Sequence, residues 1–143
     1  MIGSVVQSIV GAIISALTGA STAFERITNG GFDSGDSWTI TSAKWSIAAG
    51  VASELGTGNG LNQTIAAIAS GTPWTFSCDV GGTPQGLEIS LTSGGVVTDV
   101  LYSGLPLGAT ISESGTTTAS ADGIRIESYS AGSATVDNVS LIA

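Results

Sequence analysis

The feature that most restricts the fold is an alternation of apolar and polar residues in the segment 73–80. Its polar members occupy positions 75, 77 and 79, and its apolar members are Trp74, Phe76, Cys78 and Val80. Successive side chains of a β-strand point to opposite faces of the sheet, so this pattern predicts a strand with one buried face. A chain built on such strands has to cover that face with a second layer.

The same alternation recurs in segments 87–91, 124–127 and 136–141, and shorter apolar runs occupy 38–40, 45–47, 51–53 and 61–65. Glycine-containing pairs such as Asn29-Gly30 separate these runs and favour tight turns, and the glycine-rich run 56–60 also predicts a turn. About eight to ten strands with no long helix after residue 24 predict an all-β fold of two packed antiparallel sheets. Parallel α/β folds are excluded.

Composition limits the classes of partner. The 143 residues suit one domain, and 11 acidic residues against three basic ones give a net charge of -8. Nucleic acid is excluded as a partner, because affinity for its phosphates comes mainly from Lys and Arg. Only 10% of the residues are charged, so Gly, Ser, Thr and Ala must cover much of the surface, as is typical of assembled or extracellular proteins.

The sequence offers few residues suited to catalysis. The chain has no histidine, which rules out imidazole acid/base chemistry and histidine-ligated zinc. The single Cys78 cannot form an internal disulfide, and its place in a strand pattern predicts a buried, inert thiol. Nothing in the sequence pairs two carboxylates for glycoside hydrolysis. We therefore expect a protein that is not an enzyme.

The first 24 residues form a separate segment ahead of a domain at 25–143. Residues 1–23 carry no charge and have apolar residues at helical three- and four-residue steps. A secretory signal peptide is disfavoured by the missing positive start, and a membrane anchor by Gln7, the many Ser and Gly, and the lack of a basic flank. A docking or oligomerisation helix is favoured; a helix packed on its own domain and a β-strand stay open. The residues expected to form the contact are Val6, Ile9, Ile13 and Leu17.

Five pieces of the domain appear in a familiar order: residues 29–33 followed by Trp38, then 45–52, 61–65, 71–76 and 135–141. Together they resemble the jelly-roll β-sandwiches of the carbohydrate-binding-module type, over the chain from about residue 28 to the end. The resemblance is strongest to such domains in structural proteins of tailed bacteriophages, and it extends to modules appended to secreted glycoside hydrolases.

The resemblance implies a non-enzymatic virion protein, namely a capsid decoration, tail or fibre protein. Its expected partners are itself, as a homo-oligomer for which we expect a trimer, other virion proteins and cell-surface carbohydrate. The alternative is a carbohydrate-binding module or adhesion domain of a secreted or membrane-anchored bacterial protein, at the cell surface or outside the cell.

The resemblance also implies sites. Members of the group often hold a structural calcium between the first loop and the last strand, and the matching residues here are Asp33 and Asp137, although Asp137 could equally hydrogen-bond the loop backbone. Sugar binding requires exposed aromatic rings. Trp38, Trp45 and Trp74 are expected in the core, which leaves Tyr102 and Tyr129 as the candidate glycan contacts.

Overall fold

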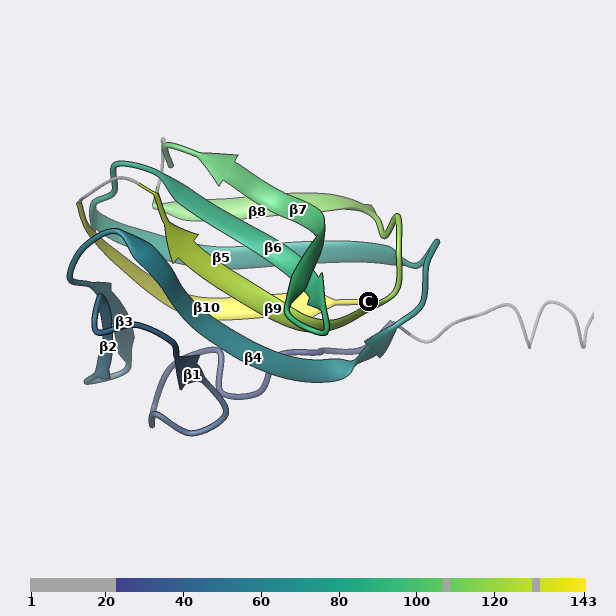
Figure 1. The fold of residues 1–143 in the computed structure, drawn as a ribbon, viewed down its shortest axis with the longest axis horizontal. Helices are drawn as coiled ribbons and strands as arrows, with labels where there is room; N and C mark the ends of the chain where they lie inside the picture. Colours follow the sequence, from purple (N-terminus) through teal and green to yellow (C-terminus); the bar gives the residue numbers. More distant parts are fainter. Residues whose placement is uncertain (1–22, 107–108, 130–131) are drawn as a thin grey trace, which may run out of the picture.

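The computed structural model describes residues 23–106, 109–129 and 132–143. The segment 1–22, with the four residues expected to mediate oligomerisation, lies outside these ranges. The described chain forms two five-stranded antiparallel sheets that pack face to face (Figure 1). The predicted all-β sandwich is therefore confirmed.

The front sheet, which faces the reader in Figure 1, has the strand order β1-β4-β9-β6-β7. Its strands are β1 (Thr39–Ile40), β4 (Gly58–Ile68), β9 (Ala121–Ser128), β6 (Leu87–Ser93) and β7 (Val96–Gly104). The back sheet has the order β2-β3-β10-β5-β8. Its strands are β2 (Trp45–Ala48), β3 (Val51–Glu54), β10 (Ser133–Ile142), β5 (Pro73–Thr83) and β8 (Thr110–Thr116).

The core lies between the sheets and is made by the alternating residues. All four apolar residues of the alternation in β5 are buried, as predicted. Trp38 and Trp45 are also buried, and the Trp38 indole N–H donates to the backbone oxygen of Asn29 at 3.0 Å. The three tryptophans are thus used for packing, which stabilises a domain that has no disulfide.

One expected turn is a strand instead. β4 begins at Gly58, inside the glycine-rich run that predicted a turn. The reason lies in Gly60, where a Cβ atom would stand 2.2 Å from the indole nitrogen of Trp45. A glycine inside a strand often marks such a close approach, so here glycine makes room for a core side chain.

The first described residues are tied to the end of the chain. Phe24 and Ala143 exchange backbone hydrogen bonds, and an isolated bridge joins Glu25 to Ile142. The Glu25 carboxylate accepts hydrogen bonds from the Ser140 hydroxyl and from backbone N–H groups on both sides of the bridge. Among the described residues, no helix is long and apolar enough to span a membrane.

Candidate functional site

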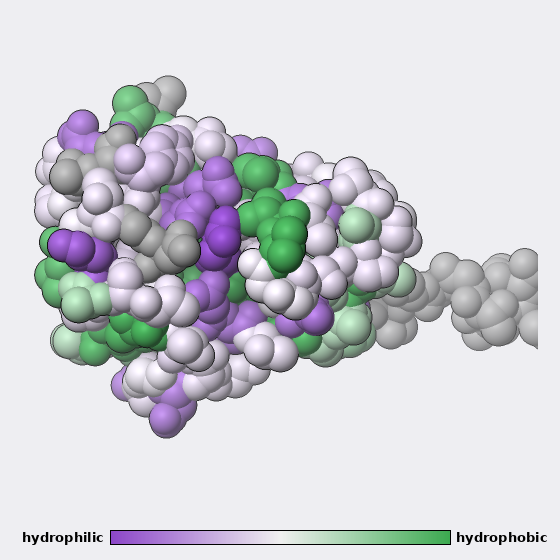
Figure 2. All heavy atoms as spheres, viewed as in Figure 1, coloured by the Kyte–Doolittle hydropathy of each residue, from purple (hydrophilic) through white to green (hydrophobic). Residues whose placement is uncertain are grey.

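The outer surface of the front sheet carries a group of polar side chains. In β4, β9 and β6 the inward positions hold apolar residues such as Leu61, Ile126 and Ile89, so the intervening residues point outward. We call this set the polar face: Asn62, Thr64, Glu88, Arg125 and Glu127, which are exposed or half-buried, together with Ser90 and Thr92, which are buried between them. Figure 2 shows hydrophilic side chains gathered in the middle of this side of the molecule.

Strand register brings the polar face together from distant parts of the sequence. Arg125 on β9 lies opposite Asn62 on β4 and opposite Ser90 on β6. In the next row along β9, Glu127 lies opposite Glu88. Directly opposed residues have neighbouring side chains, so a cation, two carboxylates, an amide and a hydroxyl share a small area.

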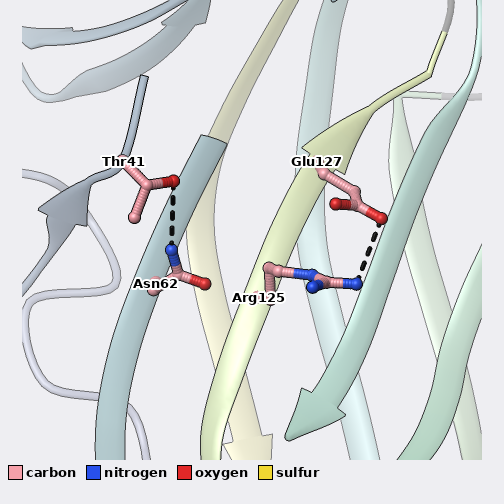
Figure 3. Close-up of polar contacts among 4 residues, drawn as sticks. All are labelled: Thr41, Asn62, Arg125 and Glu127. Carbon is pink, nitrogen blue, oxygen red and sulfur yellow. Dashed lines mark hydrogen bonds and ion pairs between the residues drawn. The ribbon is translucent and has the colours of Figure 1, made fainter. Parts of the chain in front are cut away.

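Arg125 is the centre of this group. Its Nη2 donates to Glu127 Oε1 at 3.2 Å, and the two side chains are each 18% exposed (Figure 3). In the described part of the chain that is the guanidinium's only hydrogen bond, and its Nε is buried without a partner. Beside it, the Asn62 amide donates to the Thr41 hydroxyl at 3.3 Å. The face therefore presents donors and acceptors in positions fixed by neighbouring side chains.

A pocket of about 320 Å³ lies at the β6–β7 turn end of the face. Its lining includes Thr64, Thr92, Asp122 and Gly123. The Asp122 carboxylate accepts the backbone N–H of Gly94 at 3.0 Å, which fixes the turn between β6 and β7 against the start of β9. We call this hollow the Gly123 pocket.

Gly123 keeps the pocket open. A Cβ atom there would stand 2.5 Å from the Thr92 hydroxyl oxygen and 3.3 Å from the backbone oxygen of Gln63. Gln63 itself points inward, where its side-chain amide bonds both the N–H and the C=O of Thr28 at 2.8 and 2.7 Å. The wall of the pocket is thus anchored from the inside of the sandwich.

The two candidate tyrosines are placed differently. Tyr102, on β7, is half-buried and packs against the core; burial and then the nearby Tyr129 raise the pKa of its hydroxyl. Tyr129 follows directly after β9, is 53% exposed, and donates its backbone N–H to Gly86 at 3.2 Å. Of the two tyrosines, Tyr129 is the one with an exposed ring.

Of the two aspartates expected to bind calcium, Asp33 lies in the loop before β1 and Asp137 lies within β10. The turn at Gly30 pairs with Val139 through the Val139 N–H at 2.9 Å. Asp33 is exposed and its N–H donates to the Asn29 side chain, while Asp137 accepts the N–H of Asn138 at 2.7 Å. Across the described ranges, no three Asp, Glu, Cys or His side chains are grouped as a metal site requires. Calcium binding at these residues stays a prediction.

Sequence reasoning did not find the polar face as a site. The alternation at 124–127 placed Arg125 and Glu127 on an outward face, but nothing in the sequence indicated that β4 and β6 would lie on either side of them. The sequence did hold one signal: Arg125 is one of only three basic residues in the chain, and it lies in an alternating segment.

Comparison with solved structures supports the fold. The second N-terminal cellulose-binding domain of β-1,4-glucanase C from Cellulomonas fimi matches with a TM-score of 0.62 and 17% identity, over 87% of this chain and 97% of that one. A point mutant of a family 29 carbohydrate-binding module matches with a TM-score of 0.57 and 10% identity, over 86% and 92% of the two chains.

A third match comes from a phage. The enzymatically active domain of tailspike protein 4 of bacteriophage CBA120 has a TM-score of 0.50 and 15% identity, over 83% of this chain but 21% of that one. No family model matches the sequence, and no curated protein matches it. The chain therefore has the β-sandwich fold that carbohydrate-binding modules also have.

Proposed function

We propose that the domain is a carbohydrate-binding module and that the polar face holds the glycan. The observation that carries the proposal is the fixed cluster around Arg125, with the Gly123 pocket beside it. Sugar hydroxyls both donate and accept hydrogen bonds, and the Arg125–Glu127 pair offers a donor and an acceptor side by side. The likeness to cellulose-binding and other carbohydrate-binding domains supports the proposal.

Binding accounts for this cluster better than hydrolysis does. Glu88 and Glu127 oppose one another across β6 and β9, and a pair of carboxylates is what glycoside hydrolases use, one of them as a proton donor. The Glu127 carboxylate, however, is already held as a hydrogen-bond acceptor by the Arg125 guanidinium. This favours an acceptor of sugar hydroxyls over a proton donor.

The test is affinity electrophoresis of the full chain in gels containing soluble hydroxyethylcellulose, xylan, β-glucan or galactomannan. We expect at least one polymer to retard the protein, and Arg125→Ala to weaken that binding about tenfold or more, because a desolvated charged partner is lost. Lys44→Ala is the matched control, since it removes an exposed cation outside the polar face. If Arg125→Ala binds the polymer as well as Lys44→Ala does, the proposal is contradicted. Release of reducing ends from the polymer would indicate that the protein is an enzyme.

A phage virion component is the second candidate, favoured by the likeness to a tailspike domain and by the sparsely charged sequence. In this proposal residues 1–24 hold the domain in a homo-oligomer, which we propose to be a trimer, or against other virion proteins, and the polar face contacts host-surface glycans. Light scattering on the full chain and on a chain lacking residues 1–24 tests it. An oligomer is expected only for the full chain; the same number of chains per particle for both would refute the docking role.

A further inference from the structure

Tyr129 has an unusual support. A Cβ atom built on Gly86 would stand 2.6, 2.9 and 3.1 Å from three carbons of the Tyr129 ring. The ring therefore lies against the Gly86 backbone, in space that any side chain at position 86 would occupy. Because the residue is nevertheless 53% exposed, the ring has one side on the protein and another open to solvent.

The ring also continues the polar face. Arg125, Glu127 and Tyr129 alternate along the chain, and the hydrogen bond from the Tyr129 N–H to Gly86 extends the pairing that ends at Leu87 and Ser128. Tyr129 is thus the next outward position after Glu127. From Tyr129 to Gly123 is six residues, or about 20 Å along β9. A flat aromatic surface, a polar middle and a pocket follow one another in that order.

The side chains along this line, from Tyr129 to the Gly123 pocket, carry mainly negative charge. Its one cation, Arg125, is already paired with Glu127, and Glu88 and Asp122 add carboxylates that have no cation partner among the described residues. The whole chain carries a net charge of -8. A glycan bearing carboxylates or sulfates would meet like charge, which disfavours binding.

From these three observations we infer that the ligand is an uncharged, linear glycan chain that lies along β9, with one sugar ring stacked on Tyr129 and the chain reaching the Gly123 pocket. The inference rests on the proposed function, because it specifies the ligand of the same face. Stacking suits a sugar because the ring presents an apolar surface to its apolar C–H groups. The supporting Gly86 backbone holds the tyrosine ring in place before the ligand arrives, which lowers the entropic cost of binding.

The test uses three variants of the full chain and the neutral polymer that binds best. Tyr129→Ala removes the ring and should weaken binding about tenfold. Tyr129→Phe keeps the stacking surface and should stay within about twofold of the wild type. Gly86→Ala leaves the tyrosine in the sequence but displaces its ring, and should weaken binding like Tyr129→Ala. Circular dichroism and melting temperature check that each variant is folded.

The outcomes separate the inference from the function beneath it. If Arg125→Ala loses binding while Tyr129→Ala binds like the wild type, the face is a glycan site but the stacking inference is wrong. Stronger retardation by polygalacturonate or alginate than by the neutral polymers would also overturn the inference. If the wild type binds none of the neutral or acidic polymers, both the function and the inference fail.

Discussion

Glu54, at the end of β3, offers the sharpest test of what holds the sandwich together. The residue is 5% exposed, yet its carboxylate accepts three hydrogen bonds. The Ser128 hydroxyl donates at 2.6 Å, the Gly132 N–H at 3.1 Å and the Ala134 N–H at 3.0 Å. One side chain therefore joins β3 to the end of β9 and to the start of β10.

The cost of Glu54→Ala follows from these donors. A buried donor that loses its acceptor costs about 1–3 kcal/mol. The two backbone N–H groups cannot turn away, so together they contribute about 2–6 kcal/mol; the Ser128 hydroxyl can rotate to another acceptor and is left out of the sum. Domains of this size are stable by about 5–15 kcal/mol in total. Glu54→Ala is therefore expected to remove a large part of the free energy of unfolding.

The assay is urea denaturation followed by the fluorescence of the buried tryptophans. Glu54→Gln is expected to lose about 1–3 kcal/mol, because one of its two side-chain positions becomes an N–H donor that faces another donor. Glu113→Ala, which removes an exposed carboxylate, is the control and should change stability by about 0.5 kcal/mol or less. If Glu54→Ala unfolds at the same urea concentration as the Glu113→Ala control, the reasoning is refuted.

Two further predictions follow from pKa shifts. Partial burial acts to raise the pKa of Glu25, but hydrogen bonds from Ser140 and from the N–H groups of Leu141 and Ile27 outweigh it and hold the pKa below its ordinary value of 4.5. The ionised Glu25 carboxylate therefore stabilises the fold above the unfolded-state pKa, and this stabilisation is lost as the pH falls through the native-state pKa. The difference in urea midpoint between the wild type and Glu25→Gln should accordingly shrink between about pH 6 and about pH 3. A difference that stays constant over this range would contradict the prediction. Burial, and then the charge of Asp79, raise the pKa of the Cys78 thiol to about 12. A thiol reagent at neutral pH should therefore label the protein only when urea unfolds it. Rapid labelling of the folded protein would contradict this prediction, because it would show that Cys78 is accessible.

The sequence predicted the strands that have one fully buried face. In β5 and β9 the alternation is clean because both strands lie inside their sheets, with neighbours on either side. No alternating segment marked β7 or β8 in the sequence, and both are edge strands. In β8 only Ile111 is buried, and two irregularities in the pairing of β7 with β6 interrupt the alternation. Edge strands bury less, so their pattern carries less information.

The candidate site was harder to predict than the fold because it depends on register. Asn62, Arg125 and Ser90 form one row although they come from three separate parts of the sequence. A shift of one residue in either pairing would turn a whole strand over and break the row. Tyr129 was a candidate glycan contact from the sequence, but its alignment with Arg125 and Glu127 follows only from the extended β6–β9 pairing.

Glycines beneath aromatic rings connect the core to the proposed site. Close packing of a ring on a glycine occurs at Gly60 with Trp45, at Gly115 with Trp74 and at Gly86 with Tyr129. In the first two pairs the ring is buried, at 3% and 8% exposure, and core packing explains the arrangement. In the third the ring stays 53% exposed, so core packing explains it least. A glycine that flattens an exposed ring against the sheet, in line with Arg125 and Glu127, is accounted for most directly by a ligand that covers the ring.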